Sequence, residues 1–319
     1  MKVKASRIFF LFVFLVFGLL TLVCCKRDKS KYSDTPVSGE ILIVADESYR
    51  PLLQVQLDTF HSIYKYAKIN ARYLPEPEAV SVLLNNDSAR LVILNRELNE
   101  TELQTLREMK IIPRVNRIAV DALAIMINPD NKDSLFTPSL LGDIFSGKIS
   151  TWNQLGKNPI NDSIRIVFDG NSSSNARYLK EKFLGNSPVP SNWYALESNE
   201  ALVDYVSNNV NALGVISLNW ISDRENPEVN SFLSKVTIAG VSETDSVGSD
   251  KDYYKPFQAY IALKKYPFTR DVYIISREGR NGLGTGFASF VAGDHGQRII
   301  RLMGLLPATM PIRIVKINE

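Results

Sequence analysis

Short apolar runs alternate with amphipathic stretches along most of the chain. Residues 41–45 form an unbroken apolar run, which is typical of a buried strand. Pro51 then opens a segment whose apolar side chains recur at helical spacing. These side chains are Leu53, Leu57, Phe60 and Tyr64. The pattern predicts a strand followed by a helix that packs one face against it.

The same alternation continues toward the C-terminus. Further strands are expected at 69–74, 91–94, 118–127, 164–169, 214–217 and 312–317. Further helices are expected at 76–84, 100–109, 137–145, 174–184, 200–206 and 285–303. Strands that alternate with helices predict an α/β fold, in which helices flank a mostly parallel sheet. With 319 residues the chain is long for one core and suits two.

The N-terminus carries a targeting pattern. Lys2, Lys4 and Arg7 precede an apolar run over residues 8–20, as in a secretory signal. A permanent transmembrane helix is the weaker alternative, because residues 8–23 fall short of the roughly 20 apolar residues that span a bilayer. Residues 26–38 are polar, without apolar periodicity, and predict a tether or a tail with no further role.

Charge and cysteine content exclude several functions. Removal of residues 1–24 removes three basic residues and no acid, so the formal charge falls from +3 to zero. A nucleic-acid partner is therefore not expected. Both cysteines, Cys24 and Cys25, lie at the end of the targeting segment, which leaves no disulfide or cysteine-based metal site in the body. The two histidines, His61 and His295, are far apart in sequence, so neither a metal site nor a cofactor is expected.

Residues 143–155 carry the most specific motif. Phe145, Gly147, Ile149 and Trp152 occur in an order that resembles the signature of the phosphate-binding proteins of ABC importers. The alternative is a helix that ends at a glycine and an ordinary turn. Residues 116–129, 266–270 and 304–308 also resemble segments of that family, so the resemblance extends over residues 39–319.

The resemblance implies an architecture and a location. The family has a two-lobed periplasmic-binding-protein fold, in which each lobe is a mostly parallel sheet flanked by helices and the ligand cleft lies between the lobes. Residues 39–126 plus 256–319 would form lobe one, and residues 127–255 lobe two. Residues 22–25 resemble a lipobox, which implies a signal peptide over 1–24, cleavage before Cys25 and a lipidated flexible tether over 25–38. Cleavage before Cys24 is the alternative. The protein would then be lipid-anchored on the periplasmic side of the cell envelope.

Three loops follow strands and precede helices, where oxyanions bind in open α/β sheets. In the first loop, Ser48 and Tyr49 correspond to the Thr-Phe pair that contacts phosphate in the family. Ser48 is alternatively a helix cap. In the second loop, the resemblance implies ligand roles for Ser172, Ser173, Ser174 and Asn175, which replace the family's Asp-Gly-Ser-Gly-Thr segment in part. The alternative is a solvated turn with a serine cap.

Two ligand groups of the family, the arginine cation and the carboxylate proton acceptor, are missing from their usual positions in this chain. The family's arginine upstream of the second loop is replaced by Val167 and Phe168, and Arg177 is expected to supply the cation instead. In the third loop, Asn95 and Arg96 match the family's ligand segment. Asn95 lies near the position of an Asp or Ser ligand of the family, where a carboxylate in the best-known members accepts a hydrogen bond from protonated phosphate. Asp46 or Asp121 could provide that acceptor instead. Arg96 is alternatively paired with Glu97 or Glu100 at the surface.

These features imply a non-enzymatic receptor. It would capture inorganic phosphate or a related oxyanion as a monomer and deliver it to an ABC permease in the inner membrane. One alternative is a receptor of the same fold for another oxyanion, or with a sensing role. The other is an envelope phosphohydrolase that uses a serine of the run 172–174. That enzyme is disfavoured, because neither histidine has a triad context and the chain contains no Gly-x-Ser-x-Gly elbow.

Overall fold

The computed structural model describes residues 34–156, 162–223 and 225–309. The expected signal peptide, Cys25, most of the expected tether and the expected strand 312–317 lie outside these residues. Within the described ranges, no helix is long and apolar enough to cross a bilayer.

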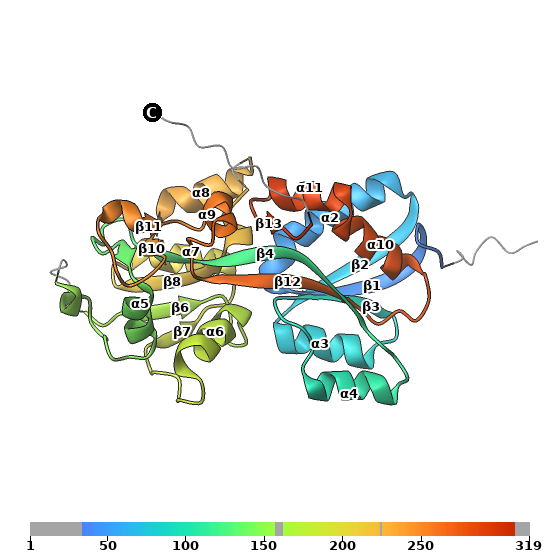
Figure 1. Cartoon of the computed structure of the whole chain (residues 1–319), viewed down its shortest axis with the longest axis horizontal. Coiled ribbons are helices and arrows are strands. Elements are labelled where there is room, and N and C mark those ends of the chain that lie inside the picture. Colours follow the sequence, from blue (N-terminus) through green and yellow to red (C-terminus); the bar gives the residue numbers. More distant parts are fainter. Residues whose placement is uncertain (1–33, 157–161, 224, 310–319) are drawn as a thin grey trace, which may run out of the picture. The chain divides into compact units, whose positions relative to one another are not determined.

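A sheet in the order β2-β1-β3-β12-β4-β8-β6-β7 runs through both lobes (Figure 1). The strands in the first half of this order are β2 (Tyr66–Leu74), β1 (Ser38–Asp46), β3 (Ala89–Leu94), β12 (Thr269–Ser276) and β4 (Arg114–Ile127). The second half contains β8 (Ala212–Ser217), β6 (Arg165–Phe168) and β7 (Trp193–Ala195). Strands β1, β2 and β3 are parallel to one another, as are β6, β7 and β8. The mostly parallel sheet of each lobe is therefore confirmed, with β12 and β4 as the antiparallel members.

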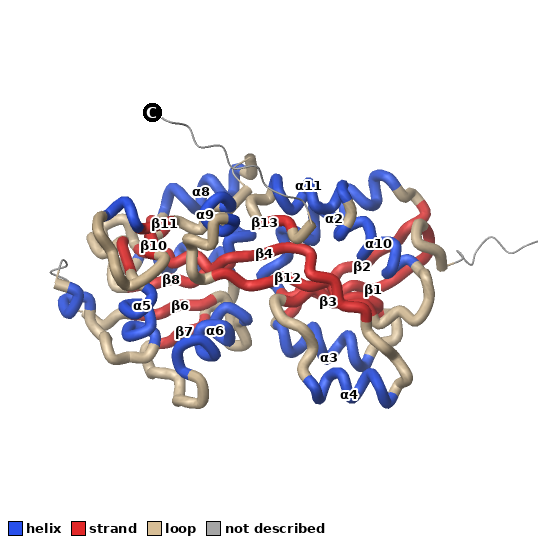
Figure 2. The backbone as a smooth tube through the Cα atoms, viewed as in Figure 1, coloured by secondary structure: helices blue, strands red, loops and turns tan. Residues whose placement is uncertain are grey.

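Strand β4 belongs to both lobes. Its first part pairs with β12, for example Val120 with Asp271, and its last part pairs with β8, from Leu123 opposite Ser217 to Ile127 opposite Leu213. Figure 2 shows β4 and β12 side by side through the middle of the molecule. Two long antiparallel strands thus connect the lobes, which is a geometry suited to a hinge.

Lobe one buries both faces of β1. Ile41, Ile43 and Ala45 pack in one core cluster and Val44 in another, which is the period-two alternation of a strand. One face is covered by α2 (Arg50–Ile63), α10 (Leu283–Ala292) and α11 (Asp294–Leu302). The other face is covered by α3 (Glu76–Asn85) and α4 (Glu100–Glu108).

Lobe two has one continuous core cluster. The helices around it are α5 (Pro138–Phe145), α6 (Ser174–Leu179), α7 (Asn199–Asn208), α8 (Pro227–Lys235) and α9 (Gln258–Ala262). Short strands complete the fold: β9 (Thr237–Ile238) and β13 (Leu306–Pro307) pair with β4, and β5 (Leu135–Phe136), β10 (Gly240–Ser242) and β11 (Tyr253–Tyr254) form a separate sheet. The short helices are η1 (Glu47–Tyr49), η2 (Trp152–Leu155), η3 (Lys180–Leu184), η4 (Leu218–Trp220) and η5 (Asp250–Asp252).

The motif at residues 143–155 has a structural role in this lobe. Phe145 and Trp152 are fully buried, and the Trp152 indole donates a hydrogen bond of 2.9 Å to the Asn211 carbonyl. Gly147 has a φ of +78° just after α5 ends, a conformation that glycine adopts without strain. The motif therefore closes α5 and anchors the following turn in the core.

Two expected elements need correction. The single helix expected at 285–303 is broken at Gly293, where ψ is −178°, so that α10 and α11 are separate helices. Strand β12 was not expected at all, although it occupies the centre of the sheet. The lobe limits at 127 and 256 stay a prediction. Ile261, Tyr266 and Phe268 pack in the core cluster of lobe two, beyond the second of these limits.

Candidate functional site

The first expected ligand loop follows β1 and contains η1. Asp46 fixes its turn, because the carboxylate Oδ1 accepts a hydrogen bond of 2.9 Å from the Ser48 backbone N–H. Asp46 therefore caps η1, and Tyr49, at the cap position of α2, makes no side-chain capping bond. Ser48 and Tyr49 are both buried. Ser48 is thus not a helix cap, which leaves its hydroxyl for another role.

The second expected ligand loop connects β6 to α6. Ser173 caps α6, because its Oγ accepts hydrogen bonds from the Asn175 N–H at 3.1 Å and the Ala176 N–H at 3.4 Å. The Ser173 hydroxyl also donates to Asp169 Oδ1, which accepts a second bond from Asn175 Nδ2 at 3.2 Å. Ser172 is exposed, whereas Ser174 is buried. Ser173 and Asn175 therefore shape the loop, and Ser174 faces lobe one.

Ser48 and Ser174 meet between the lobes. Their Oγ atoms lie 3.3 Å apart, although 126 residues separate them in sequence. Arg270, from β12, donates from Nη1 to Ser174 Oγ at 3.4 Å and is also buried. Two hydroxyls and one guanidinium thus converge from three separate elements.

Asp121 of β4 orients Arg270. The Asp121 Oδ2 atom accepts a hydrogen bond of 3.0 Å from Arg270 Nε, and further bonds from Ser217 Oγ at 2.8 Å and Tyr49 OH at 3.4 Å. The Arg270 guanidinium also lies over the Tyr49 ring, 5.6 Å from its centre. We call this buried group the polar centre. Its members are Asp46, Ser48, Tyr49, Asp121, Ser174, Ser217, Asn219 and Arg270.

Arg270, Ser217 and Asn219 are not among the expected ligand residues. Asn219 donates from Nδ2 to the Ser48 carbonyl at 2.8 Å, a further bond between the lobes. Arg270 is buried on the same face of β12 as Val272 and Ile274. An arginine in phase with buried aliphatic residues of a strand is the sequence signal that points to it.

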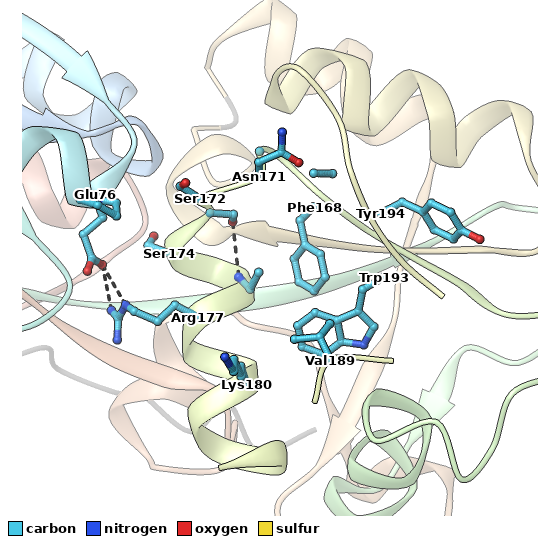
Figure 3. A pocket seen from close by; sticks show the side chains of 15 residues that line it. Glu76, Phe168, Asn171, Ser172, Ser174, Arg177, Lys180, Val189, Trp193 and Tyr194 are labelled. Carbon is cyan, nitrogen blue, oxygen red and sulfur yellow. Dashed lines mark hydrogen bonds and ion pairs between the residues drawn. The ribbon is translucent and has the colours of Figure 1, made fainter. Parts of the chain in front are cut away.

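The remaining expected ligand residues form a second cluster at the edge of the cleft. Arg177 of α6 donates from Nε and Nη2 to Glu76 Oε2 of α3, at 3.1 and 2.9 Å (Figure 3). Arg177 also donates to Asn95 Oδ1 and to Glu181. Among the described residues, its bonds therefore run to these partners and not to the polar centre.

Arg96 belongs to the same cluster. Its Nε atom donates to Glu76 Oε1 at 2.6 Å, and its two Nη atoms donate to Glu102 at 2.8 Å each. The expected surface pairing of Arg96 with Glu97 or Glu100 is replaced by these two partners, and only the Glu97 carbonyl accepts a bond from it. Glu76 thus connects an arginine of lobe one to an arginine of lobe two.

Several buried polar atoms of the interlobe region have no hydrogen-bond partner. Among the described residues, the unpartnered acceptors are Asp46 Oδ2, Asp121 Oδ1, Asn175 Oδ1 and Asn219 Oδ1. The amide donors of Asn175 and Asn219 are bonded, which fixes the orientation of both side chains. An unpartnered buried polar atom costs about 1–3 kcal/mol. Within the described chain, the Arg270 Nη2 donor is also without a hydrogen-bond partner, so the region favours a ligand that carries both oxyanion acceptors and a hydrogen-bond donor.

Burial raises the pKa of three acids in this region. Burial raises the pKa of Asp46 to about 6, an effect that Arg270, Ser174 and the Ser48 N–H oppose and Asp169 increases. Burial also raises the pKa of Asp169, against the hydrogen bond from Ser173. The pKa of Glu47 is raised by burial as well, and Asp169 and Glu200 add to that rise, against Arg50. The carboxylates of lobe two therefore raise the pKa values of the carboxylates of lobe one across the cleft.

Two cavities flank the loop that precedes α6. One has a volume of about 310 Å³, is lined by residues of both lobes, and is bordered by Asp46 and Ser174. The other, of about 490 Å³, lies beside α6, with Glu76 and Arg177 on one side and Phe168 and Trp193 on the other (Figure 3). Within the described residues, no group of three or more histidines, cysteines or acids could hold a metal ion.

Residues 30–295 match the family model described as a PBP superfamily domain. The phosphate-binding protein PstS of Bacillus subtilis (strain 168) is 19% identical over 314 residues, which cover 96% of this chain and 95% of that protein. The phosphate-binding protein PstS 2 of Streptococcus pneumoniae serotype 4 is 24% identical over 130 residues, 41% of this chain and 42% of that protein. The chain thus spans less than half of this curated relative in the match.

Solved structures share the fold. A Clostridium perfringens protein with bound phosphate has a TM-score of 0.68 at 19% identity, over 85% of this chain and 100% of that chain. An ABC-type phosphate transport receptor from Vibrio cholerae has a TM-score of 0.62 at 22% identity, over 84% of this chain and 100% of that chain. At these identities the likeness establishes the fold, which confirms the two-lobed α/β architecture.

Proposed function

The chain belongs to the PBP superfamily, and we propose that it is a non-enzymatic receptor that binds phosphate between its lobes for an ABC importer. The observation that carries the proposal is the convergence of Ser48, Ser174 and Arg270 at the interlobe contact. Relatives named as phosphate-binding proteins support the choice of phosphate.

The polar centre offers suitable chemistry for a tetrahedral oxyanion. Two hydroxyls and a guanidinium donate hydrogen bonds, and their burial lowers the local dielectric and strengthens each bond. Ser48 belongs to lobe one and Ser174 to lobe two, so a ligand bound to both stabilises the closed arrangement. A ligand that favours the closed state in this way selects it from the hinge motion.

Asp46 and Asp121 supply the proton acceptors that Asn95 lacks. Each carries a buried carboxylate oxygen without a partner at the polar centre. A phosphate P–OH group can donate to such an oxygen, whereas fully ionised sulfate has no proton to donate and is repelled. We therefore expect the site to prefer phosphate and arsenate over sulfate. If the site held sulfate, the carboxylates of Asp46 and Asp121 would repel the sulfate oxygens, and no proton would offset that repulsion.

The cluster of Glu76, Arg96 and Arg177 is assigned to lobe closure in this proposal. Arg177 pairs with Glu76 from the opposite lobe, and the Glu76 side chain is buried while that of Arg177 is half-buried. The prediction that Arg177 binds the ligand stays open, as do those for Asn95, Arg96, Ser172, Ser173 and Asn175. Ser173 and Asn175 would act through the loop that they shape around Asp169.

The positions of the two histidines do not favour a hydrolase. His61 accepts a hydrogen bond at Nε2 from the Ile69 N–H at 3.2 Å, and His295 stacks on Phe290. Among the described residues, the Ser173 and Ser174 hydroxyls bond to Asp169, Ser48 and Arg270. A serine–histidine hydrolase needs a histidine beside the serine, and the hydrogen bond of His61 and the ring stacking of His295 involve Ile69 and Phe290 instead.

The lipid anchor is part of the same proposal. A signal peptide over residues 1–24 and a lipid on Cys25 would hold the receptor, as a monomer, near its permease at the periplasmic face. The sequence of residues 2–25 supports this location. Cys25→Ser is expected to move the protein from the membrane fraction to the soluble fraction. Unchanged fractionation of the variant would contradict the anchor.

Thermal melts with different anions test the proposed ligand. A ligand present at about 100 times its dissociation constant adds roughly 2.7 kcal/mol to the free energy of unfolding. Phosphate and arsenate are expected to raise the melting temperature of the protein, and sulfate at the same ionic strength is expected to raise it less. Equal shifts with sulfate would contradict the acceptor role of Asp46 and Asp121. No shift with any of the three anions would overturn the proposed ligand.

A further inference from the structure

The interlobe cavity of about 310 Å³ is lined by an excess of carboxylates. Asp46 and Glu47 come from lobe one, and Asp169, Glu197 and Glu200 come from lobe two. Arg50 is the one basic residue among the described lining, and its Nη2 atom pairs with Glu47 at 2.8 Å. The wall of this cavity is therefore acidic from both sides, next to the cationic and hydroxyl donors of the polar centre.

Two of these carboxylates, Glu197 and Glu200, have no ion-pair partner among the described residues. In contrast, Arg50 pairs with Glu47, and the charge of Arg270 acts on Asp46 and Asp169. Asp169 accepts hydrogen bonds from Ser173 and Asn175, but no ion pair joins it, Glu197 or Glu200 to a basic residue of the described chain. The acids also interact unfavourably with one another, because Asp169 and Glu200 both disfavour the charged form of Glu47. Closure of the lobes brings like charges together, so a cationic group in the cavity would offset this repulsion.

Asp46 provides an independent indication of a ligand. Its side chain is 2% exposed, lines the cavity, and has an Oδ2 atom without a hydrogen-bond partner. The adjoining Ser174 hydroxyl also lines the cavity and contacts Arg270. Ser174 and Arg270 thus present hydrogen-bond donors for an anion. The adjoining carboxylates of the cavity present acceptors for a donor group.

The cavity is also larger than inorganic phosphate requires. A water molecule takes about 30 Å³ in the liquid, so a volume of 310 Å³ corresponds to roughly ten waters. Phosphate has five non-hydrogen atoms and would fill only part of it. A ligand of about twice that size would extend from the polar centre toward Glu197 and Glu200.

The acceptors suit an ammonium group better than a metal ion. A divalent cation needs several oxygen ligands at about 2–2.6 Å, and the described residues contain no acid cluster that could hold one. An ammonium group has three hydrogen-bond donors and tolerates longer, partly hydrated contacts with exposed carboxylates. Glu197 and Glu200 are exposed at the rim, where such contacts can form.

We propose that the preferred ligand is a phosphate monoester or phosphonate that carries an ammonium group. Its phosphoryl oxygens would bind Ser48, Ser174 and Arg270, and its ammonium group would bind the carboxylates of Glu197 and Glu200, with Asp46 between the two ends. This inference rests on the proposed function, because it places the phosphoryl group in the same polar centre. It names the ligand class more narrowly than inorganic phosphate.

Calorimetric titration with matched ligands tests the inference. Inorganic phosphate, ethyl phosphate, 2-aminoethyl phosphate and ethanolamine are titrated into the parent protein. We expect 2-aminoethyl phosphate to bind roughly three- to tenfold more tightly than ethyl phosphate, because the added charge pairs are with two exposed carboxylates and each such pair contributes only modestly in water. Ethanolamine alone is expected to bind at least a hundredfold more weakly than 2-aminoethyl phosphate.

A double variant locates the effect. Glu197→Gln together with Glu200→Gln keeps the shape of both exposed side chains and removes their charge, so the fold should be retained. The ratio of the dissociation constants of ethyl phosphate and 2-aminoethyl phosphate should fall to about one. Inorganic phosphate should bind the variant at least as tightly as it binds the parent. The control is Glu78→Gln together with Glu108→Gln, two exposed acids of lobe one, and should keep the parent ratio.

The outcomes separate the inference from the proposed function. Equal affinities of the two esters in the parent, or an unchanged ratio in the Glu197 and Glu200 variant, would overturn the inference. Binding of inorganic phosphate without binding of either ester would also overturn it and leave the proposed function intact. If no phosphoryl compound binds at all, the proposed function and the inference both fail.

Discussion

At the scale of single residues, the site depends on which polar side chains are already used by the fold. In the run 172–174, the Ser173 hydroxyl serves as a helix cap, while the buried Ser174 hydroxyl points to Ser48 and Arg270. Ser173 and Ser174, two neighbours of the same residue type, thus have different roles. Sequence resemblance alone treats them as one ligand segment, because capping and burial are set by the surrounding loop.

Asp46 makes the stability depend on pH. Its ordinary pKa of 3.8 rises to about 6 through burial, despite the opposing charge of Arg270. Between these two values the unfolded chain loses the proton first, so the folded state binds more protons and its stability falls as the pH rises. The difference corresponds to roughly 3 kcal/mol for this fully buried group.

Asp46→Asn removes this contribution and keeps an oxygen for the Ser48 N–H. The variant is expected to be more stable than the parent at pH 7, by up to about 3 kcal/mol, and close to it at pH 4. Urea unfolding at both pH values measures the difference. Asp130→Asn, at an exposed position, is the control and should show little change. An offset between Asp46→Asn and the parent that is the same at both pH values would refute the assignment.

At the scale of elements, periodicity predicts the strands and helices of lobe one well, because β1 and β3 are nearly uniform apolar runs. Strand β12 is missed because Arg270 and Asp271 interrupt its apolar pattern. Arg270 is tolerated there only because Asp121 of the neighbouring strand pairs with it. That pairing depends on strand order, which local sequence does not contain.

The break between α10 and α11 has a similar origin. The sequence over 285–303 is apolar enough for one helix, but Gly293 adopts an extended conformation and the chain turns. A side chain at Gly296 would approach Val291 atoms at 2.4 Å, so the two helices pack closely at this point. The requirement for glycine becomes visible only when the packed helices are known.

Arg177 illustrates how lobe packing decides a role. Its position in the first turn of α6 suggests a ligand cation, yet its Nε and Nη2 atoms donate hydrogen bonds to Glu76 of α3. Glu76 in turn holds Arg96. This bridge between lobes requires α3 and α6 to face each other, which resemblance to a family does not specify. The cation that reaches Ser174 is Arg270 instead.

At the scale of the whole molecule, the account joins a hinge to a buried polar centre. Strands β4 and β12 connect the lobes, and Arg270 and Asp121 lie on these same strands. Ligand recognition and lobe connection thus share the centre of the sheet. A ligand that bonds to Ser48 and Ser174 at once would be held only when the lobes are closed.

Titration of phosphate into three proteins tests this claim most directly. The three proteins are the parent, Ser174→Ala and the control Ser191→Ala, which removes an exposed serine hydroxyl of the same lobe outside the lining of both cavities. Loss of a hydrogen bond to a charged ligand costs about 1.5–3 kcal/mol, so Ser174→Ala should weaken phosphate binding by roughly tenfold or more. Ser191→Ala should stay within about twofold of the parent, since Ser191 is exposed and lies outside the lining of both cavities. Equal affinities of the two variants would contradict the account, as would a parent protein that does not bind phosphate.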